Sequence, residues 1–125
     1  MTIFASDNVT SACPEIMEAL IEANLGNEDS YGNDKWSKDL NRKFSELFET
    51  KVKVFPAVTG TAANSLALSA LTPGYGSIYC HKISHINVDE CGAPEFFTGG
   101  AKLITLEGKN GKISSEELNK NIRGE

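Results

Sequence analysis

The stretch KVKVFPAVTGTAANSLAL (residues 51–68) runs from β-branched residues, through a glycine turn, into a segment rich in alanine and leucine. Its first part, residues 51–58, predicts a short buried strand. Its second part predicts a helix that begins at the turn around Gly60. A strand that passes through a tight turn into a helix is a building block of α/β domains.

The residues that follow continue this alternation of strand and helix. The segments SIYC (77–80) and AKLITL (101–106) predict two further strands, and HINVDECGA (85–93) between them predicts a short helix. The segment GKNGKI (108–113) predicts a turn. Ser114 and Glu117 form a capping box for a last helix within 114–122. This order of elements predicts an α/β domain with a mainly parallel sheet.

The residues that precede the quoted stretch predict two helices and a loop. Pro14 suits the first turn of a helix over PEIMEALIEAN, and Gly26 is its natural stop. The segment GNEDSYGND (26–34) is dense in turn formers and predicts a loop. Residues 35–50 place Trp36, Leu40, Phe44, Leu47 and Phe48 on one apolar helical face. We expect an N-terminal segment at 1–34 and the larger, sheet-containing domain at 35–125.

Composition indicates a globular protein. The chain has 125 residues, of which 40% are hydrophobic and 23% charged, with a net charge of −5. The absence of a basic cluster argues against nucleic acid as the main partner. Three cysteines without a C-x-x-C pair favour reduced thiols. Because no secretory signal and no long apolar run are visible, we expect a soluble, cytoplasmic protein without a membrane partner.

The quoted turn is a candidate anion site. Free N–H groups and the helix dipole favour a phosphate at the start of a helix. Gly60 would let the backbone approach the anion, and the hydroxyls of Thr59 and Thr61 would donate to it. The alternative is that a threonine only caps the helix, which is common.

His85 follows the second predicted strand, as the turn follows the first. Neighbouring parallel strands would bring these two loops together, so that His85 would face a ligand or act on its protons. The alternative is an ordinary half-buried histidine. Cys80, His81, His85 and Cys91 do not have the spacing of a structural zinc site, and we expect no metal.

Six segments, in order, resemble one enzyme family. They are FASDNVT, PEIMEAL, GNEDSYGND, VTGTAAN, HKISHINVDECGAPEFFTGGAKLI and GKISSEELNKNI. With them the chain resembles the front part of the low-specificity L-threonine aldolases, in the aromatic amino acid beta-eliminating lyase/threonine aldolase family. The resemblance implies part of the three-layer α/β/α large domain of a fold-type-I enzyme that uses pyridoxal 5'-phosphate (PLP).

The resemblance also implies roles for individual residues. Gly60 and Thr61, with Thr59 as a weaker match, would hold the cofactor phosphate, and His85 would stack on its pyridine ring. Ser6 would help to bind the substrate carboxylate, and Tyr31 would lie near the active site of a neighbouring subunit. A homo-oligomer, a dimer or a tetramer, is therefore expected.

The implied reaction is cleavage of L-threonine or L-allo-threonine into glycine and acetaldehyde. The lysine that carries the cofactor in this family, its aspartate and its arginines have no counterpart in these 125 residues. We therefore expect an N-terminal portion that is inactive alone. A related beta-eliminating lyase, a phenylserine aldolase and a non-catalytic module that binds a phosphorylated ligand remain alternatives.

Overall fold

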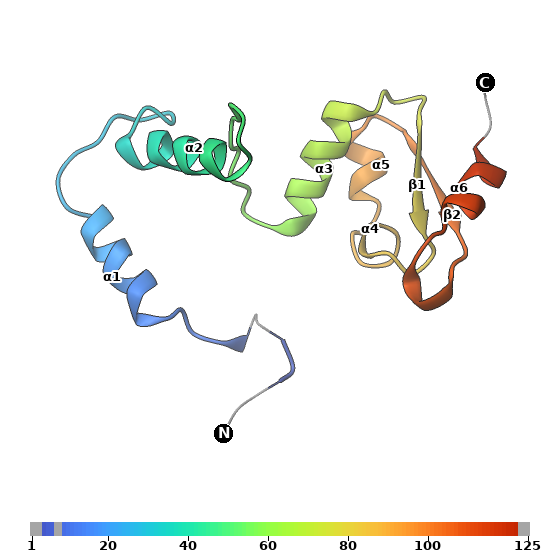
Figure 1. The fold of residues 1–125 in the computed structure, drawn as a ribbon, viewed down its shortest axis with the longest axis horizontal. Helices are drawn as coiled ribbons and strands as arrows, with labels where there is room; N and C mark the ends of the chain where they lie inside the picture. The colour runs from blue at the N-terminus through green and yellow to red at the C-terminus, as the bar shows by residue number, and fades with distance from the viewer. Residues whose placement is uncertain (1–3, 7–8, 123–125) are drawn as a thin grey trace. The chain divides into compact units, whose positions relative to one another are not determined.

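The computed structural model describes residues 4–6 and 9–122 and contains two compact units that divide after Phe55 (Figure 1). The first unit comprises residues 1–55 and the second residues 56–125. Each unit is described by itself below. The domain boundary expected between residues 34 and 35 stays a prediction.

The first unit contains two helices separated by a loop, as predicted. Helix α1 (Pro14–Ala23) begins with a proline, whose missing N–H costs nothing in a first turn, and Gly26 follows with φ +83°. Helix α2 (Lys35–Leu47) begins after Asp34, whose carboxylate accepts a hydrogen bond from the Ser37 N–H at 2.7 Å. This bond satisfies one of the free amides of the first turn.

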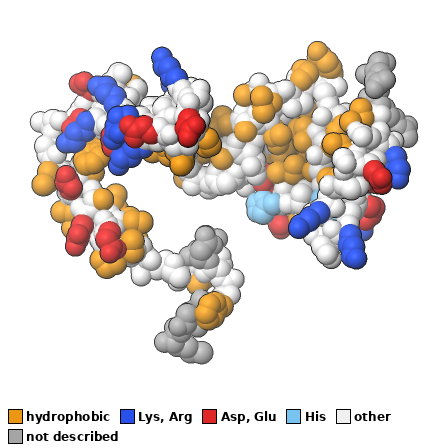
Figure 2. Space-filling model, viewed as in Figure 1, with side chains coloured by type: hydrophobic (Ala, Val, Ile, Leu, Met, Phe, Trp, Pro, Cys, Tyr) orange, Lys and Arg blue, Asp and Glu red, His pale blue; other side chains and the backbone are white. Residues whose placement is uncertain are grey.

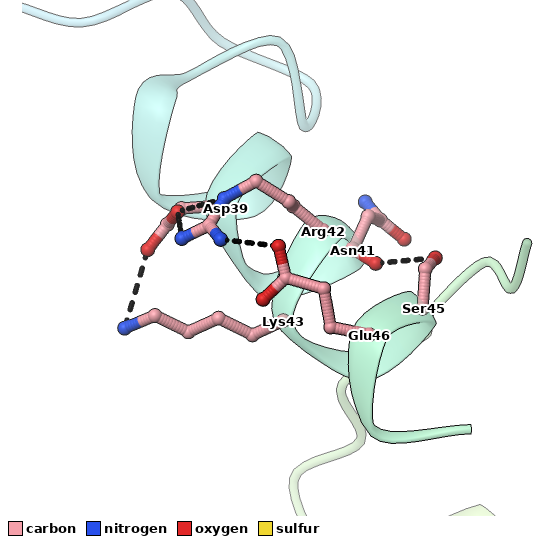
Figure 3. A network of polar contacts seen from close by, with 6 residues as sticks. All are labelled: Asp39, Asn41, Arg42, Lys43, Ser45 and Glu46. Carbon is pink, nitrogen blue, oxygen red and sulfur yellow. Dashed lines mark hydrogen bonds and ion pairs between the residues drawn. The ribbon is translucent and has the colours of Figure 1, made fainter. Parts of the chain in front are cut away.

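The exposed side of α2 carries a network of charged residues (Figure 3). Arg42 donates to Asp39 and, at 2.7 Å, to Oε1 of Glu46. The Nζ atom of Lys43 lies 3.3 Å from Asp39 Oδ2. Since these ion pairs are solvent-exposed, each adds little to stability, and together they mark the face of α2 that is turned to water.

The predicted strand at residues 51–58 is wrong. These residues belong to no helix or strand, and no strand pairs with them in the described part of the chain. Side chains of α2 bind their amides instead: Val52 N–H donates to Ser45 Oγ at 3.1 Å, and Val54 N–H donates to Asn41 Oδ1 at 2.7 Å. A β-branched run favours extended backbone, but a strand also needs a partner to complete its hydrogen bonds.

The second unit contains the sheet. Helix α3 (Gly60–Leu71) leads to strand β1 (Ser77–His81), and strand β2 (Lys102–Leu106) pairs with it in parallel, with Ser77 opposite Lys102 and His81 opposite Leu106. The connection between the strands carries α4 (His85–Val88) and α5 (Ala93–Phe97). A 3₁₀ turn (Lys109–Gly111) and α6 (Ser115–Asn121) follow β2. The two later predicted strands and the helices at the quoted turn and at Ser114 are confirmed.

Helices flank the two strands on both faces (Figure 1). Ile78 and Cys80 are buried, whereas Tyr79 between them points to the opposite face, where its hydroxyl donates to Asn121 O at 3.2 Å. Helix α5 packs against α3, and α6 packs against β2. The α/β class and the largely parallel sheet are therefore confirmed.

Helix α5 is absent from the sequence-based expectations. It has five residues, which is too short for a hydrophobic period to show. Thr98 closes it: its hydroxyl donates to Pro94 O at 2.7 Å and accepts from Ala101 N–H at 3.1 Å. Gly99 and Gly100 then take positive φ angles, +76° and +116°, and turn the chain into β2.

Among residues 4–6 and 9–122, no helix has the length and apolar character that a membrane span requires.

Candidate functional site

The quoted turn forms the N-terminus of α3, with Thr59 as the cap residue. The Thr59 side-chain oxygen accepts from Ala62 N–H at 3.1 Å, and its backbone oxygen accepts from Ala63 N–H at 3.0 Å. The amides of Gly60 and Thr61 have no acceptor in the described part of the chain. Because the Thr59 hydroxyl accepts one bond and keeps its own proton, capping the helix leaves it able to donate to an anion.

The surroundings of this turn suit a negatively charged group. The first turn of α3 contains no acidic residue, so nothing there repels an anion. Apart from its chain neighbours and the backbone of α3, a Cβ atom built on Gly60 would meet no atom within 4 Å, so the space beside this glycine is open. A phosphate can therefore reach the two unused amides, and the donor set fits the phosphate of PLP.

A pocket of about 430 Å³ opens beside the turn, between α3 and α5. Ser65, one of its lining residues, is buried and its hydroxyl has no hydrogen-bond partner within the described residues. The full lining is Thr59, Thr61, Ala62, Ser65, Leu66, Ser69 and Phe97.

His85 is the first residue of α4, and 64% of its side chain is exposed. Its Nδ1 atom lies 2.7 Å from Oε1 of Glu90. The same carboxylate oxygen accepts from the side-chain amide of Asn64 at 2.6 Å. Since Asn64 lies on α3, four residues after Gly60, Glu90 connects the His85 loop to the helix that starts at the candidate anion site.

This connection differs from the expected one. The sequence predicts that neighbouring strands bring the two loops together. Residues 51–58 form no strand, however, and a side-chain bridge links α3 to the His85 loop instead. Sequence reasoning missed Glu90, because an acidic residue in a turn-rich stretch gives no sign of burial. Its only signal is its position five residues after His85.

His81 does not share a helix face with His85. It ends β1, its Nδ1 atom accepts from Ile83 N–H at 3.2 Å, and its Nε2 atom lies 3.0 Å from Gly108 O. Over the residues that the structure describes, no three His, Cys, Asp or Glu side chains gather closely enough to hold a metal.

Ser6 and Tyr31, the two expected substrate-binding residues, belong to the first unit. The Ser6 backbone oxygen accepts from Val9 N–H at 3.4 Å. Tyr31 has φ +60° and is 99% exposed, and Gly32 after it has φ +76°. A positive φ is rare for an aromatic residue, so this loop presents the Tyr31 ring to solvent in an unusual backbone conformation. Both roles stay predictions.

The fold and the site define an α/β domain with a helix start that has two unused amides and an exposed histidine held by a buried carboxylate. The chain belongs to the beta-eliminating lyase family, whose model matches residues 4–125.

Known proteins similar to the chain are threonine aldolases. The chain is 50% identical over 115 residues to the low specificity L-threonine aldolase of Pseudomonas aeruginosa, and 48% identical to that of a Pseudomonas species. Each match covers 92% of this chain and 33% of the relative, so the chain spans about a third of their length. The structure of Leishmania major threonine aldolase matches 90% of the chain and 32% of its own, with a TM-score of 0.82 and 24% identity. This likeness confirms the predicted fold class, part of a fold-type-I α/β/α domain.

Proposed function

We propose that this chain forms the N-terminal third of a PLP-dependent aldolase that cleaves L-threonine or L-allo-threonine into glycine and acetaldehyde. The observation that carries the proposal is the 50% identity with the P. aeruginosa low specificity L-threonine aldolase. Because the chain spans 33% of that relative, we assign the activity to a complete subunit that contains these residues, and we expect none from the chain alone.

The turn at the start of α3 holds the cofactor phosphate in this proposal. The free amides of Gly60 and Thr61 donate to phosphate oxygens, and the Thr59 hydroxyl adds a third donor while it caps the helix. When bound, PLP supplies an electron sink for the electron pair left on Cα as the Cα–Cβ bond breaks.

His85 positions the ligand ring and is the catalytic residue that this chain contributes. Its imidazole is held at Nδ1 by Glu90, and 64% of the side chain remains exposed. A ring fixed at one edge and open on its face can stack on a flat ligand. It thereby sets the plane against which the breaking bond is aligned.

Ser6 and Tyr31 contact the substrate in this proposal. Ser6 donates to the amino-acid carboxylate, and Tyr31 reaches the site of a neighbouring subunit in a cytoplasmic homo-oligomer. The exposed ring and positive φ of Tyr31 support a side chain presented to a partner, since such a conformation persists only where its surroundings demand it.

A chimera tests the proposal. Residues 1–125 replace the matching third of the P. aeruginosa relative, and acetaldehyde and glycine are measured with threonine and PLP. We expect the chimera to release both products and the 125-residue chain to release neither. A folded chimera that binds PLP but forms no glycine would contradict the proposal.

The same chimera separates the alternatives. Rates on threonine, allo-threonine and phenylserine, measured side by side, distinguish a phenylserine aldolase, and release of ammonia instead of an aldehyde identifies a beta-eliminating lyase. Saturable binding of PLP by the chain alone, with no product from the chimera, would identify a non-catalytic module that binds a phosphorylated ligand.

A further inference from the structure

Glu90 is an acidic residue whose side chain is fully buried. A buried carboxylate is costly unless hydrogen-bond donors compensate it. One oxygen, Oε1, accepts from both Asn64 and His85, at 2.6 and 2.7 Å. The other, Oε2, is buried and has no partner among the atoms of the described residues. The stabilisation of this buried group is thus concentrated on one oxygen and two donors.

The chemistry of these groups decides which nitrogen of His85 carries the proton. A carboxylate oxygen only accepts, so at 2.7 Å the Nδ1 atom of His85 must donate to Glu90. In the neutral ring the lone pair then lies on Nε2, which has no partner in the described part of the chain.

His81 provides the opposite case within the same chain. Its Nδ1 atom accepts from Ile83 N–H at 3.2 Å, so the proton lies on Nε2, which donates to Gly108 O at 3.0 Å. The structure thus holds its two histidines in opposite tautomers.

We propose that Glu90 is the positioning residue for His85: it holds the imidazole in the Nδ1–H tautomer and ties it to α3 through Asn64. The role of this arrangement in catalysis rests on the proposed function. One buried oxygen then fixes both the orientation of the stacking ring and its attachment to the helix that starts with the phosphate turn. It also leaves Nε2 of His85 as the ring atom that can accept a proton.

Nitrogen NMR of the 125-residue chain labelled with ¹⁵N-histidine, at a concentration at which light scattering shows a monomer, tests the tautomers directly. The chain has two histidines, so two pairs of ring signals are expected. We expect a protonated Nδ1 with a bare Nε2 for His85, and the reverse for His81. Equal ring spectra for the two residues, including the averaged spectra of an unfolded chain, would overturn the inference.

Substitutions of Glu90 separate its acceptor oxygen from its charge. In E90Q the amide oxygen still accepts from both donors, and its NH₂ takes the place of the unpartnered Oε2, so His85 keeps the Nδ1–H tautomer. In E90A the acceptor is gone and we expect this preference to be lost. D89N, at the neighbouring residue, is the matched control and leaves both histidines unchanged.

The His81 signals report whether a variant folds. An E90A spectrum with altered His85 and unaltered His81 supports positioning. If E90A unfolds, the His81 pattern is lost too, and the comparison of wild-type with E90Q decides. Loss of the Nδ1–H tautomer in folded E90Q, or its persistence in folded E90A, would overturn the inference.

A PLP titration of the chimera separates this inference from the proposed function. Opposite tautomers without PLP binding would support Glu90 as the positioning residue while the aldolase proposal fails. PLP binding with equal tautomers would support the aldolase proposal and overturn the inference about Glu90.

Discussion

Thr59 combines two roles that the sequence presents as alternatives. Its oxygen accepts from Ala62 N–H and caps α3, and its hydroxyl proton remains available for an anion. A capping threonine is therefore compatible with a phosphate site. The residue that distinguishes the two roles is Gly60, because capping does not require glycine at this position.

Substitution of Gly60 by alanine is expected to weaken binding without harming the fold. Apart from its chain neighbours and the backbone of α3, a Cβ here meets no atom within 4 Å. Because alanine also restricts the unfolded chain, stability of the 125-residue chain should rise by about 0.5 kcal/mol. The added methyl group would occupy the space that a phosphate needs, and PLP binding by the chimera should weaken about tenfold, which is about 1.4 kcal/mol.

Thermal unfolding and PLP titration measure these two effects. Ala70→Ser, on the same helix and outside the pocket beside its start, is the matched control and should leave PLP affinity unchanged. Unaltered affinity in the Gly60→Ala chimera would place the phosphate elsewhere.

At the scale of elements, the start of α2 is an acid-sensitive point. The Ser37 hydroxyl, followed by the Ser37 N–H, holds the pKa of the Asp34 carboxyl below its ordinary value of 3.8. A lowered pKa in the folded state means that the stabilisation is complete above pH 3.8 and is lost as the pH falls through the folded value. Likewise, the Arg42 guanidinium, followed by Lys43, lowers the pKa of Asp39.

We expect the first turn of α2 to loosen below pH 3.8, when Asp34 takes up a proton. The chemical shift of the Ser37 amide, followed by NMR as the pH is lowered, measures this change. Asp34→Asn keeps an oxygen at the cap but does not titrate, and its Ser37 amide should show no such step. Asp29→Asn in the preceding loop is the control, and a step of equal size in Asp34→Asn would contradict the assignment.

Elements with a long period were predictable, and those that depend on partners were not. Helix α2 shows its apolar period over several turns, and Ser114 caps α6 by accepting from Glu117 N–H at 3.1 Å, as the capping box predicts. The run at 51–58 failed because a strand needs a second strand, and α5 was missed because five residues show no period.

At the scale of the whole molecule, apolar surface remains uncovered in both units (Figure 2). Leu20 and Phe48 in the first unit and Leu71 and Phe97 in the second are exposed. Apolar surface of this extent is typical of interaction sites, and the relatives are about three times as long as the match. These observations support a further part of the subunit as the cover.

The 125-residue chain is therefore expected to bind the dye 8-anilinonaphthalene-1-sulfonate (ANS) and to associate as its concentration rises. The chimera with the remaining two thirds of the P. aeruginosa relative should do neither to the same degree, because those residues bury the apolar faces. Fluorescence and light scattering measure the difference. A monodisperse chain without dye binding would show that these surfaces need no cover.

Some features of this protein follow from the sequence alone. Residues 59–61 predict a capped helix start. The threonine hydroxyls, the glycine and the alanine-rich run that follows favour it through interactions within one helical turn. Local hydrogen bonds and hydrophobic period likewise predict α1, α2, α6 and the two strands. Only the tertiary structure decides that Glu90 is buried, that it joins His85 to Asn64, and that the amides of Val52 and Val54 bind side chains of α2. These features depend on side-chain contacts between separate elements, for which the sequence carries no period and no capping signal.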